Sequence, residues 1–433
     1  MILNAFTRWS LFWVLLCSPA AALQADPLPE PLTFEAALDT AANPAHFELL
    51  QIDQQLQALR AELGIKQGEY GFSVDFRGRW REIGTSDLAL PGDDDGDNAA
   101  SLIVSKPLYD FGLQNSRENY LALQLQALEY QKQMKIERRR LQIMERYFAV
   151  LNADNEFISE NEALAIGFIR YDNALEDQEL GLVPEIEVLR LQSEYELIRQ
   201  KRSLAVHRQR LTRAMLAEAM GYPEQLSSDL EVPQIDPRQT VPDDLDAMVE
   251  RALNQSPEAL LAHARTRAAH AAIGIADASN NPSLDLELEV SRYERDSRLR
   301  DDWRASLYFE IPIYSSASSD KVDLAQAKHR LALADQQQMQ SHLRLEILEL
   351  WQQIQQLQLK LQGHSIEQDY RDKYLDRSRA EYELEFKTDL GDSMVLYSRS
   401  NAQRLRSLYA YELAYQRLVA LVGFDFINQT PSQ

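Results

Sequence analysis

The residues that decide the fold are Phe-Ser-Val-Asp-Phe-Arg-Gly-Arg-Trp-Arg, positions 72–81. Apolar or small side chains occupy every second position, and hydroxyl or charged side chains occupy the positions between them. Strict alternation with period two indicates a β-strand with one apolar and one wet face. A run of about 10 residues is also the length that a tilted strand needs to cross a bilayer.

Three further stretches repeat this pattern. Residues 283–291 alternate Leu or Val with acidic and hydroxyl side chains, and residues 303–313 alternate apolar side chains with Arg304, Ser306 and Glu310. Residues 100–108 are less regular, because Ile103 falls on the polar face. A periplasmic β-sandwich also has alternating strands. The charged faces favour strands around a water-filled lumen instead.

Four such strands cannot close a membrane barrel by themselves. An open sheet edge in lipid is prohibitive, because its unpaired backbone groups find no water. We therefore expect other copies of the chain to complete the barrel. Three protomers would supply 12 strands, although the arithmetic also permits two or four protomers.

The chain contains two copies of one unit, about 210 residues apart. Gly64-Ile65 recurs as Gly274-Ile275, and Pro107-Leu108-Tyr109 recurs as Pro312-Ile313-Tyr314. We expect a first repeat over residues 33–230 and a second over residues 243–430, each with a helix, two strands and a long helical hairpin. A Pro-rich linker, 231–242, separates the repeats.

Long helices account for most of the rest. Residues 108–183 and 313–430 contain no proline, and Leu343, Ile347, Leu350, Ile354 and Leu357 follow a heptad seam. A helix over residues 113–180 would be on the order of 100 Å long at about 1.5 Å per residue. A helix pair of that length predicts a tube wall or a rod.

The N-terminus is predicted to be an export signal. Arg8 precedes an apolar run that ends at Cys17, and small residues follow at positions 20–22. We expect a signal peptide over residues 1–22, too short for a membrane anchor. Lipidation of Cys17 is the alternative, although Leu15-Leu16 lacks the small residue that such a site has before its cysteine.

Composition excludes several classes of protein. The 433 residues have a net charge of −22, which argues against nucleic-acid binding through bulk charge. The single Cys excludes a disulfide framework and a Cys-based metal site. A mean hydropathy of −0.40 leaves too little apolar sequence for a bundle of transmembrane helices.

Together these residues resemble the TolC-like outer-membrane efflux family, over nearly the whole chain after the signal peptide. The resemblance implies a mixed α and β membrane protein: a homotrimer with a 12-stranded outer-membrane barrel and a long periplasmic α-helical coiled-coil barrel. It also implies an exit duct for efflux or type I secretion. The implied partners are a periplasmic adaptor, an inner-membrane transporter and outer-membrane lipid. The cargo is not encoded in a duct wall.

The resemblance also assigns a docking tip. The run Leu180-Gly181-Leu182-Val183-Pro184, with Glu187 after it, looks like the family's periplasmic helix turn. Independently, Gly181 permits the left-handed conformation that ends a helix, and Pro184 fits the first turn of the next. The alternative is an ordinary helical turn without a docking role.

The second tip departs from the family pattern. The family's aspartates become Met394 and Tyr397, and the nearby acidic residues are Asp389 and Asp392. Repeated by three-fold symmetry, these two and Glu187 are candidates for a periplasmic aperture that binds cations. The alternative for the aspartates is capping of a helix start, for which Asp is a preferred residue.

The remaining motifs predict no chemistry. Pro107, Gly112 and Pro312 are expected at strand-to-helix junctions. Asp93 to Asp97 fails the calcium-loop template, because Pro91 and Leu102 occupy required positions. The seven His residues show no metal spacing, and no nucleotide or nucleophile motif occurs, so we expect no enzyme, cofactor or metal. The alternative function is a periplasmic coiled-coil adaptor or scaffold without a pore.

Overall fold

The computed structural model describes residues 28–82, 96–225, 228–237, 241–242, 244–294, 301–384 and 390–423. The predicted signal peptide with Cys17, most of the acidic run before Asp97, and Asp389 lie outside the described residues.

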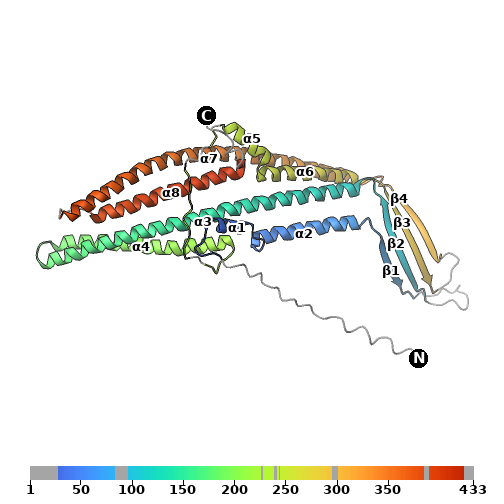
Figure 1. Cartoon of the computed structure of the whole chain (residues 1–433). Helices are drawn as coiled ribbons and strands as arrows, with labels where there is room; N and C mark the ends of the chain where they lie inside the picture. The colour runs from blue at the N-terminus through green and yellow to red at the C-terminus, as the bar shows by residue number, and fades with distance from the viewer. Residues whose placement is uncertain are drawn as a thin grey trace, which may run out of the picture.

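Helices and strands follow one another in two similar series (Figure 1). The first series is α1 (Phe34–Asp39), a 3-10 turn η1 (Thr40–Ala42), α2 (Phe47–Gly68), β1 (Ser73–Arg79), β2 (Ala99–Tyr109), α3 (Leu113–Glu179) and α4 (Glu185–Met220). The second is α5 (Leu245–Gln255), α6 (Pro257–Ala278), β3 (Ser283–Tyr293), β4 (Trp303–Glu310), α7 (Ser318–Glu383) and α8 (Leu390–Val422). The mixed α and β class expected from the sequence is confirmed. The exact limits of the two repeats stay a prediction.

The four strands form one antiparallel sheet in the order β1-β2-β3-β4. The register places Val74 beside Val104, Val104 beside Leu288, and Leu288 beside Ala305. One row away, Asp75, Ile103, Glu289 and Arg304 are neighbours in the same way. The alternation of all four strands is therefore in phase, and the sheet has one apolar and one polar face.

The long helices form a wall that runs away from the sheet (Figure 1). Near the sheet, α3 packs against α2 on one side and α6 on the other, and α6 packs against α7. Farther away, α4 packs against α3, α3 against α8, and α8 against α7. Helices α4 and α7 are thus the outer members of the far half of the wall. None of the described helices is both long enough and apolar enough to cross a membrane.

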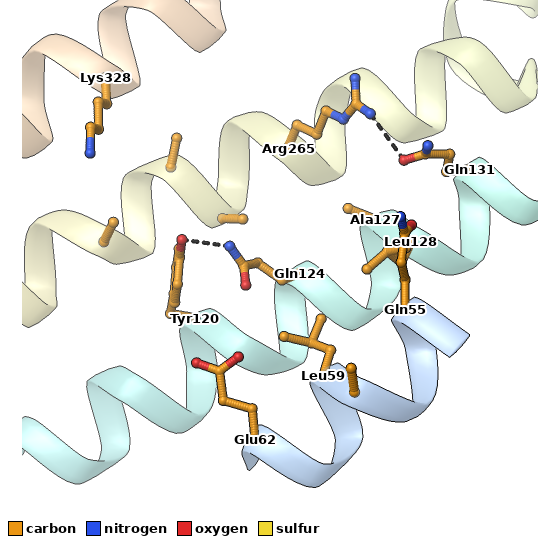
Figure 2. A pocket seen from close by; sticks show the side chains of 14 residues that line it. Gln55, Leu59, Glu62, Tyr120, Gln124, Ala127, Leu128, Gln131, Arg265 and Lys328 are labelled. Carbon is orange, nitrogen blue, oxygen red and sulfur yellow. Dashed lines mark hydrogen bonds between the residues drawn. The ribbon is translucent and has the colours of Figure 1, made fainter. Parts of the chain in front are cut away.

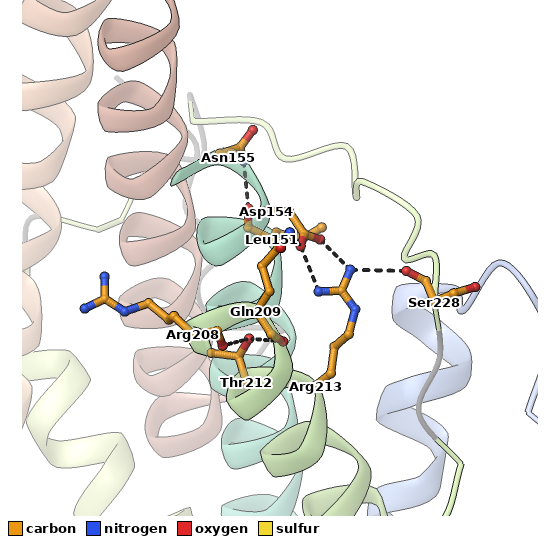
Figure 3. Close-up of polar contacts among 8 residues, drawn as sticks. All are labelled: Leu151, Asp154, Asn155, Arg208, Gln209, Thr212, Arg213 and Ser228. Carbon is orange, nitrogen blue, oxygen red and sulfur yellow. Dashed lines mark hydrogen bonds and ion pairs between the residues drawn. The ribbon is translucent and has the colours of Figure 1, made fainter. Parts of the chain in front are cut away.

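The core lies midway along the wall, where the short helices pack on the long ones. Tyr147 of α3 is fully buried there, and its hydroxyl lies 2.8 Å from the carbonyl oxygen of Leu32 and 2.6 Å from that of Glu231. Residues at both ends of the first series therefore meet on one side chain. Nearby, Arg213 of α4 bonds Asp154 of α3 at 2.8 Å and the carbonyl of Ser228 at 3.1 Å (Figure 3).

One prediction about an element limit is wrong. The alternation of residues 303–313 predicted a strand to Ile313, but β4 ends at Glu310 and Ile313 is exposed outside it. Pro312 lacks the N–H that would continue the ladder.

Candidate functional site

The apolar face of the sheet is open to its surroundings. The large apolar side chains on this face lie next to one another and are all exposed. They are Val74, Phe76, Leu102, Leu288, Val290, Trp303, Leu307 and Phe309. Trp80, which follows the last residue of β1, and Trp303, the first residue of β4, are 82% and 71% exposed. A continuous apolar surface of this kind is far larger than a soluble monomer tolerates, so it fits lipid.

Cations are the only charges on the apolar face within the four strands, and sequence reasoning did not single them out. Lys106 lies beside Leu286, and its ammonium is 4.6 Å from the centre of the Phe72 ring. Arg292 lies on the same face beside Ala100. Long basic side chains can extend from an apolar surface towards headgroups or water.

The polar face holds ion pairs and hydroxyl contacts. Arg304 of β4 lies 2.6 Å from Glu289 of β3, and Ser101 Oγ lies 2.7 Å from Ser291 Oγ. Asp97 is 2% exposed and lies 3.4 to 3.5 Å from the guanidinium groups of Arg79 and Arg81. Charged groups on this face and apolar groups on the other match a wall between water and lipid.

The sheet has two edges without a strand partner among the described residues, one on β1 and one on β4. Both edge strands carry exposed apolar side chains, such as Phe76 and Phe309. Exposed, apolar edge strands are sites for pairing with another chain.

The predicted tip is the turn between α3 and α4, at the end of the wall remote from the sheet (Figure 1). Gly181 has a φ of +72°, its N–H donates to Gln178, and the N–H of Leu182 donates to Asp177. This pattern is a Schellman motif, which satisfies the last carbonyls of α3. Leu180 and Leu182 are 72% and 70% exposed, so the turn presents apolar side chains to its surroundings. Val183 is half-buried, and Pro184 precedes the first residue of α4 in an extended conformation.

The candidate aperture residues do not form one cluster within the described chain. Glu187, in the first turn of α4, bonds Arg190, which holds the pKa of that carboxyl below its usual value. Asp392, in the first turn of α8, lies 2.6 Å from the guanidinium of Arg170 on α3. Sequence reasoning did not identify Arg170, because a partner more than two hundred positions away leaves no local pattern.

The three junction residues occupy different environments. Gly112 precedes α3 with a φ of +100°, a conformation that side chains rarely adopt. Pro107 lies inside β2, where the register with β3 shifts, and Pro312 lies between β4 and α7. Asp110, not singled out in the sequence, accepts hydrogen bonds from the N–H groups of Gly112 and Gln114 and so caps α3.

A hollow of about 600 Å³ lies on the wall between α2, α3 and α6 (Figure 2). Alanine side chains, including Ala127 and Ala268, form much of its lining. Arg265 bonds Gln131 at 3.1 Å, and Gln124 bonds Tyr120 at 2.5 Å. Side chains with the arrangement of a catalytic centre are not among these residues. Within the part of the chain that the structure describes, no cluster of three or more His, Cys, Asp or Glu could hold a metal ion.

Residues 248–423, which span most of the second series, match the model of the outer membrane efflux protein family. The chain therefore contains an outer membrane efflux protein domain over these residues. An outer-membrane location agrees with this domain and with the exposed apolar face of the sheet, and it leaves the long helices in the periplasm.

Solved structures show the same fold for the chain as a whole. The structure of CusC, whose description refers to transmembrane channel formation, superposes with a TM-score of 0.73 at 17% identity and covers 90% of this chain and 92% of its own. The CmeC outer membrane channel of Campylobacter jejuni gives 0.71 at 15% identity, with coverages of 90% and 85%. The outer membrane protein VceC of Vibrio cholerae gives 0.69 at 14% identity, with coverages of 90% and 96%.

No curated protein matches the chain in sequence. Neither the family model nor these structures support the alternative of a periplasmic adaptor or scaffold without a pore.

Proposed function

We propose that three copies of this outer membrane efflux protein form an exit duct. Cargo passes through a lumen lined by the polar face of the sheet and continued by the helical wall. Since the duct has no energy source of its own, an inner-membrane transporter drives export and a periplasmic adaptor joins the two.

The observation that carries the proposal is the four-stranded sheet with an apolar outer face and two open edges. In lipid each unpaired edge group costs several kcal/mol, because no water can replace its partner. Pairing β1 of one copy with β4 of the next removes every edge. Three copies with four strands each give a barrel of 12 strands.

The helical wall supports the same closure. Since α4 and α7 are the outer members of its far half, ring closure brings α4 of one copy against α7 of the next. Both helices have exposed leucine side chains on the sides that face away from their own neighbours, including Leu204 and Leu359.

The proposed docking site for the adaptor is the turn Leu180-Gly181-Leu182-Val183-Pro184. Its leucines are exposed at the tip of a helical hairpin, where a chain end or a second hairpin has unobstructed access. In the trimer the turn occurs three times around the periplasmic mouth. Glu187 and Asp392 lie in the first turns of α4 and α8 at the same end. We propose that these two residues line that mouth together with Asp389, which precedes α8 in the sequence.

The test is fractionation followed by conductance. We expect the protein in the outer-membrane fraction as a heat-modifiable trimer that resists SDS, and we expect discrete conductance steps when the purified trimer is added to a planar bilayer. Recovery in the soluble periplasm, or a trimer that does not conduct, would overturn the duct.

A further inference from the structure

The outer helices of the wall carry matching rows of apolar side chains. Leu197, Leu204 and Leu211 lie seven residues apart on α4, and α7 has Leu359 and Ile366 with the same spacing. All five are more than half exposed. A seven-residue repeat is the spacing of a coiled-coil seam, and neither row is covered by the described residues.

Gly363 of α7 lies between Leu359 and Ile366, on the same side of the helix. A Cβ built on it would have no atom of the described chain within 4 Å. Glycine weakens a helix interior, and no packing against the described residues accounts for it here. The glycine leaves an opening between two apolar side chains, which is the geometry of a hole that receives a leucine from a facing helix.

Contacts within the protomer fix the heights of the two rows along the wall. Leu211 lies two residues closer to the tip than Arg213, which pairs with Asp154 of α3. Because α3 and α4 are antiparallel, this pair and the pair of Arg208 with Glu156 place Leu211 level with residues 153–156 of α3.

The contacts of α7 with α8, and of α8 with α3, place Gly363 at nearly the same height. Gln358 of α7 bonds Tyr411 of α8. Tyr411 lies midway between Arg406 and Arg417, which pair with Glu156 and Glu145 of α3. Gly363 is five residues closer to the tip than Gln358, which makes it level with Glu156 and places it within about three residues, or about 5 Å, of the height of Leu211.

Charges next to the two rows are complementary. Residues 197–217 of α4 contain basic side chains and no acidic one, whereas residues 367–376 of α7 contain four acidic and two basic side chains and are net acidic. Lys201 lies between Leu197 and Leu204, and Asp369 lies one turn from Ile366. Neither has an ion-pair partner among the described residues. Their heights differ by about four residues, or about 6 Å, which a lysine side chain spans.

We infer that α4 of one copy packs along α7 of the next with Leu211 seated over Gly363 and Lys201 paired with Asp369. The occupant of this surface is a second copy of the chain. Rotation about an axis parallel to the wall leaves every residue at its own height along the wall, so residues at similar heights on α4 and α7 meet between neighbouring copies. The inference rests on the proposed ring of three copies and adds the side chains and register that join them.

Disulfide cross-linking tests the register. In a background with Cys17→Ser, which leaves no other thiol, Leu211→Cys with Gly363→Cys should convert most of the protein to covalent dimers and trimers upon oxidation. The matched control is Leu211→Cys with Leu345→Cys, an exposed leucine of α7 about 27 Å away, which should not cross-link. A trimer in which the first pair stays reduced would overturn the register alone. A protein that is monomeric throughout would overturn the duct as well.

Charge exchange tests the polar contact. Lys201→Glu and Asp369→Lys should each lower the temperature at which the SDS-resistant trimer dissociates, and the double variant should restore it. If the decreases in dissociation temperature of the two single variants add up in the double variant, the proposed contact between Lys201 and Asp369 is wrong.

Discussion

Arg170 on α3 lies 2.6 Å from Asp392 on α8, and this ion pair reverses the charge order of the pairs farther from the tip. Elsewhere along the contact between these helices, α3 supplies the acid and α8 the arginine. Those pairs are Glu160 with Arg399, Glu156 with Arg406 and Glu145 with Arg417. Among these four pairs, α8 supplies the carboxylate in the pair nearest the tip, where α8 begins.

Removal of Arg170 should release that carboxylate. Both side chains are more than a third exposed, so we expect Arg170→Gln to change stability by less than about 1 kcal/mol. The free carboxylate of Asp392 should strengthen block by Mg²⁺ added on the periplasmic side, measured as single-channel conductance. Asp389→Ala with Asp392→Ala should abolish the block. If neither variant changes it, the proposed acidic ring at the mouth is wrong.

A charge at the α3–α4 turn should prevent export without preventing assembly. Gly181→Asp puts a carboxylate between two exposed leucines, and the φ of +72° costs a non-glycine residue about 1 to 2 kcal/mol. Trimers should form in normal amounts while export falls at least tenfold. Gly181→Asn has the same shape and a similar backbone cost without the charge, and it should export. If Gly181→Asp exports normally, the turn does not dock an adaptor.

The two faces of the sheet should respond oppositely to the same substitution. Val104 lies between Val74 and Leu288 on the apolar face, and Ser105 lies between Ser73 and Glu287 on the polar face. Val104→Lys should cost roughly 2–4 kcal/mol if it is near the bilayer midplane and should strongly reduce the SDS-resistant trimer. Ser105→Lys should insert normally. Equal trimer yields would contradict the assignment of the faces.

Arg139 should matter for stability although it is far from either end of the duct. It is buried, and its guanidinium donates to the carbonyls of Ala41 at 3.0 Å and Ala219 at 3.2 Å. Arg139→Met leaves the buried carbonyl of Ala41 and the partly buried carbonyl of Ala219 without this donor, at a cost of roughly 2–4 kcal/mol. Thermal melting in detergent measures the loss. Arg140→Met, at the exposed neighbouring position, should melt like the parent.

Glu412 should make the protein less stable as pH rises. It is 7% exposed on α8, one carboxylate oxygen accepts from Gln416 and the other has no partner, and burial raises its pKa. Since the folded state holds this proton more tightly than the unfolded state, stability falls as pH rises from the ordinary value through the raised one.

Glu412→Gln removes this loss because it is neutral at every pH and keeps the shape of the side chain. At about pH 7 the variant should be more stable than the parent by roughly 1–3 kcal/mol, and the difference should shrink below about pH 4. Melting curves across that range provide the measurement, with the exposed Glu383→Gln as control. A constant difference at all pH values would contradict the assignment.

The strands were predictable because each meets water on one face and an apolar phase on the other. This difference is encoded residue by residue in positions 72–81, and the register confirms it. Ile311 and Ile313 extend the same alternation, but backbone pairing ends where Pro312 cannot donate, and side-chain patterning does not report that. Gly181 was predictable for a similar local reason, since its conformation requires glycine.

Long-range contacts could not be predicted in this way. Arg170, Arg139 and Tyr147 each bond to groups far away in the sequence, and nothing in their immediate neighbours distinguishes them from other arginines and tyrosines of α3. Gly363 likewise looks like an ordinary helix breaker until the wall shows that its surroundings within the protomer are open.

The repetition of one series of elements within the chain also has an evolutionary consequence. A shorter ancestor with a single series would need six molecules to surround the same pore, and each additional molecule adds a loss of translational freedom during assembly. Fusion of two series halves that number. After the fusion, the two helical turns no longer need to have the same sequence. One turn has the sequence Leu-Gly-Leu-Val-Pro, and the other has Asp389 and Asp392.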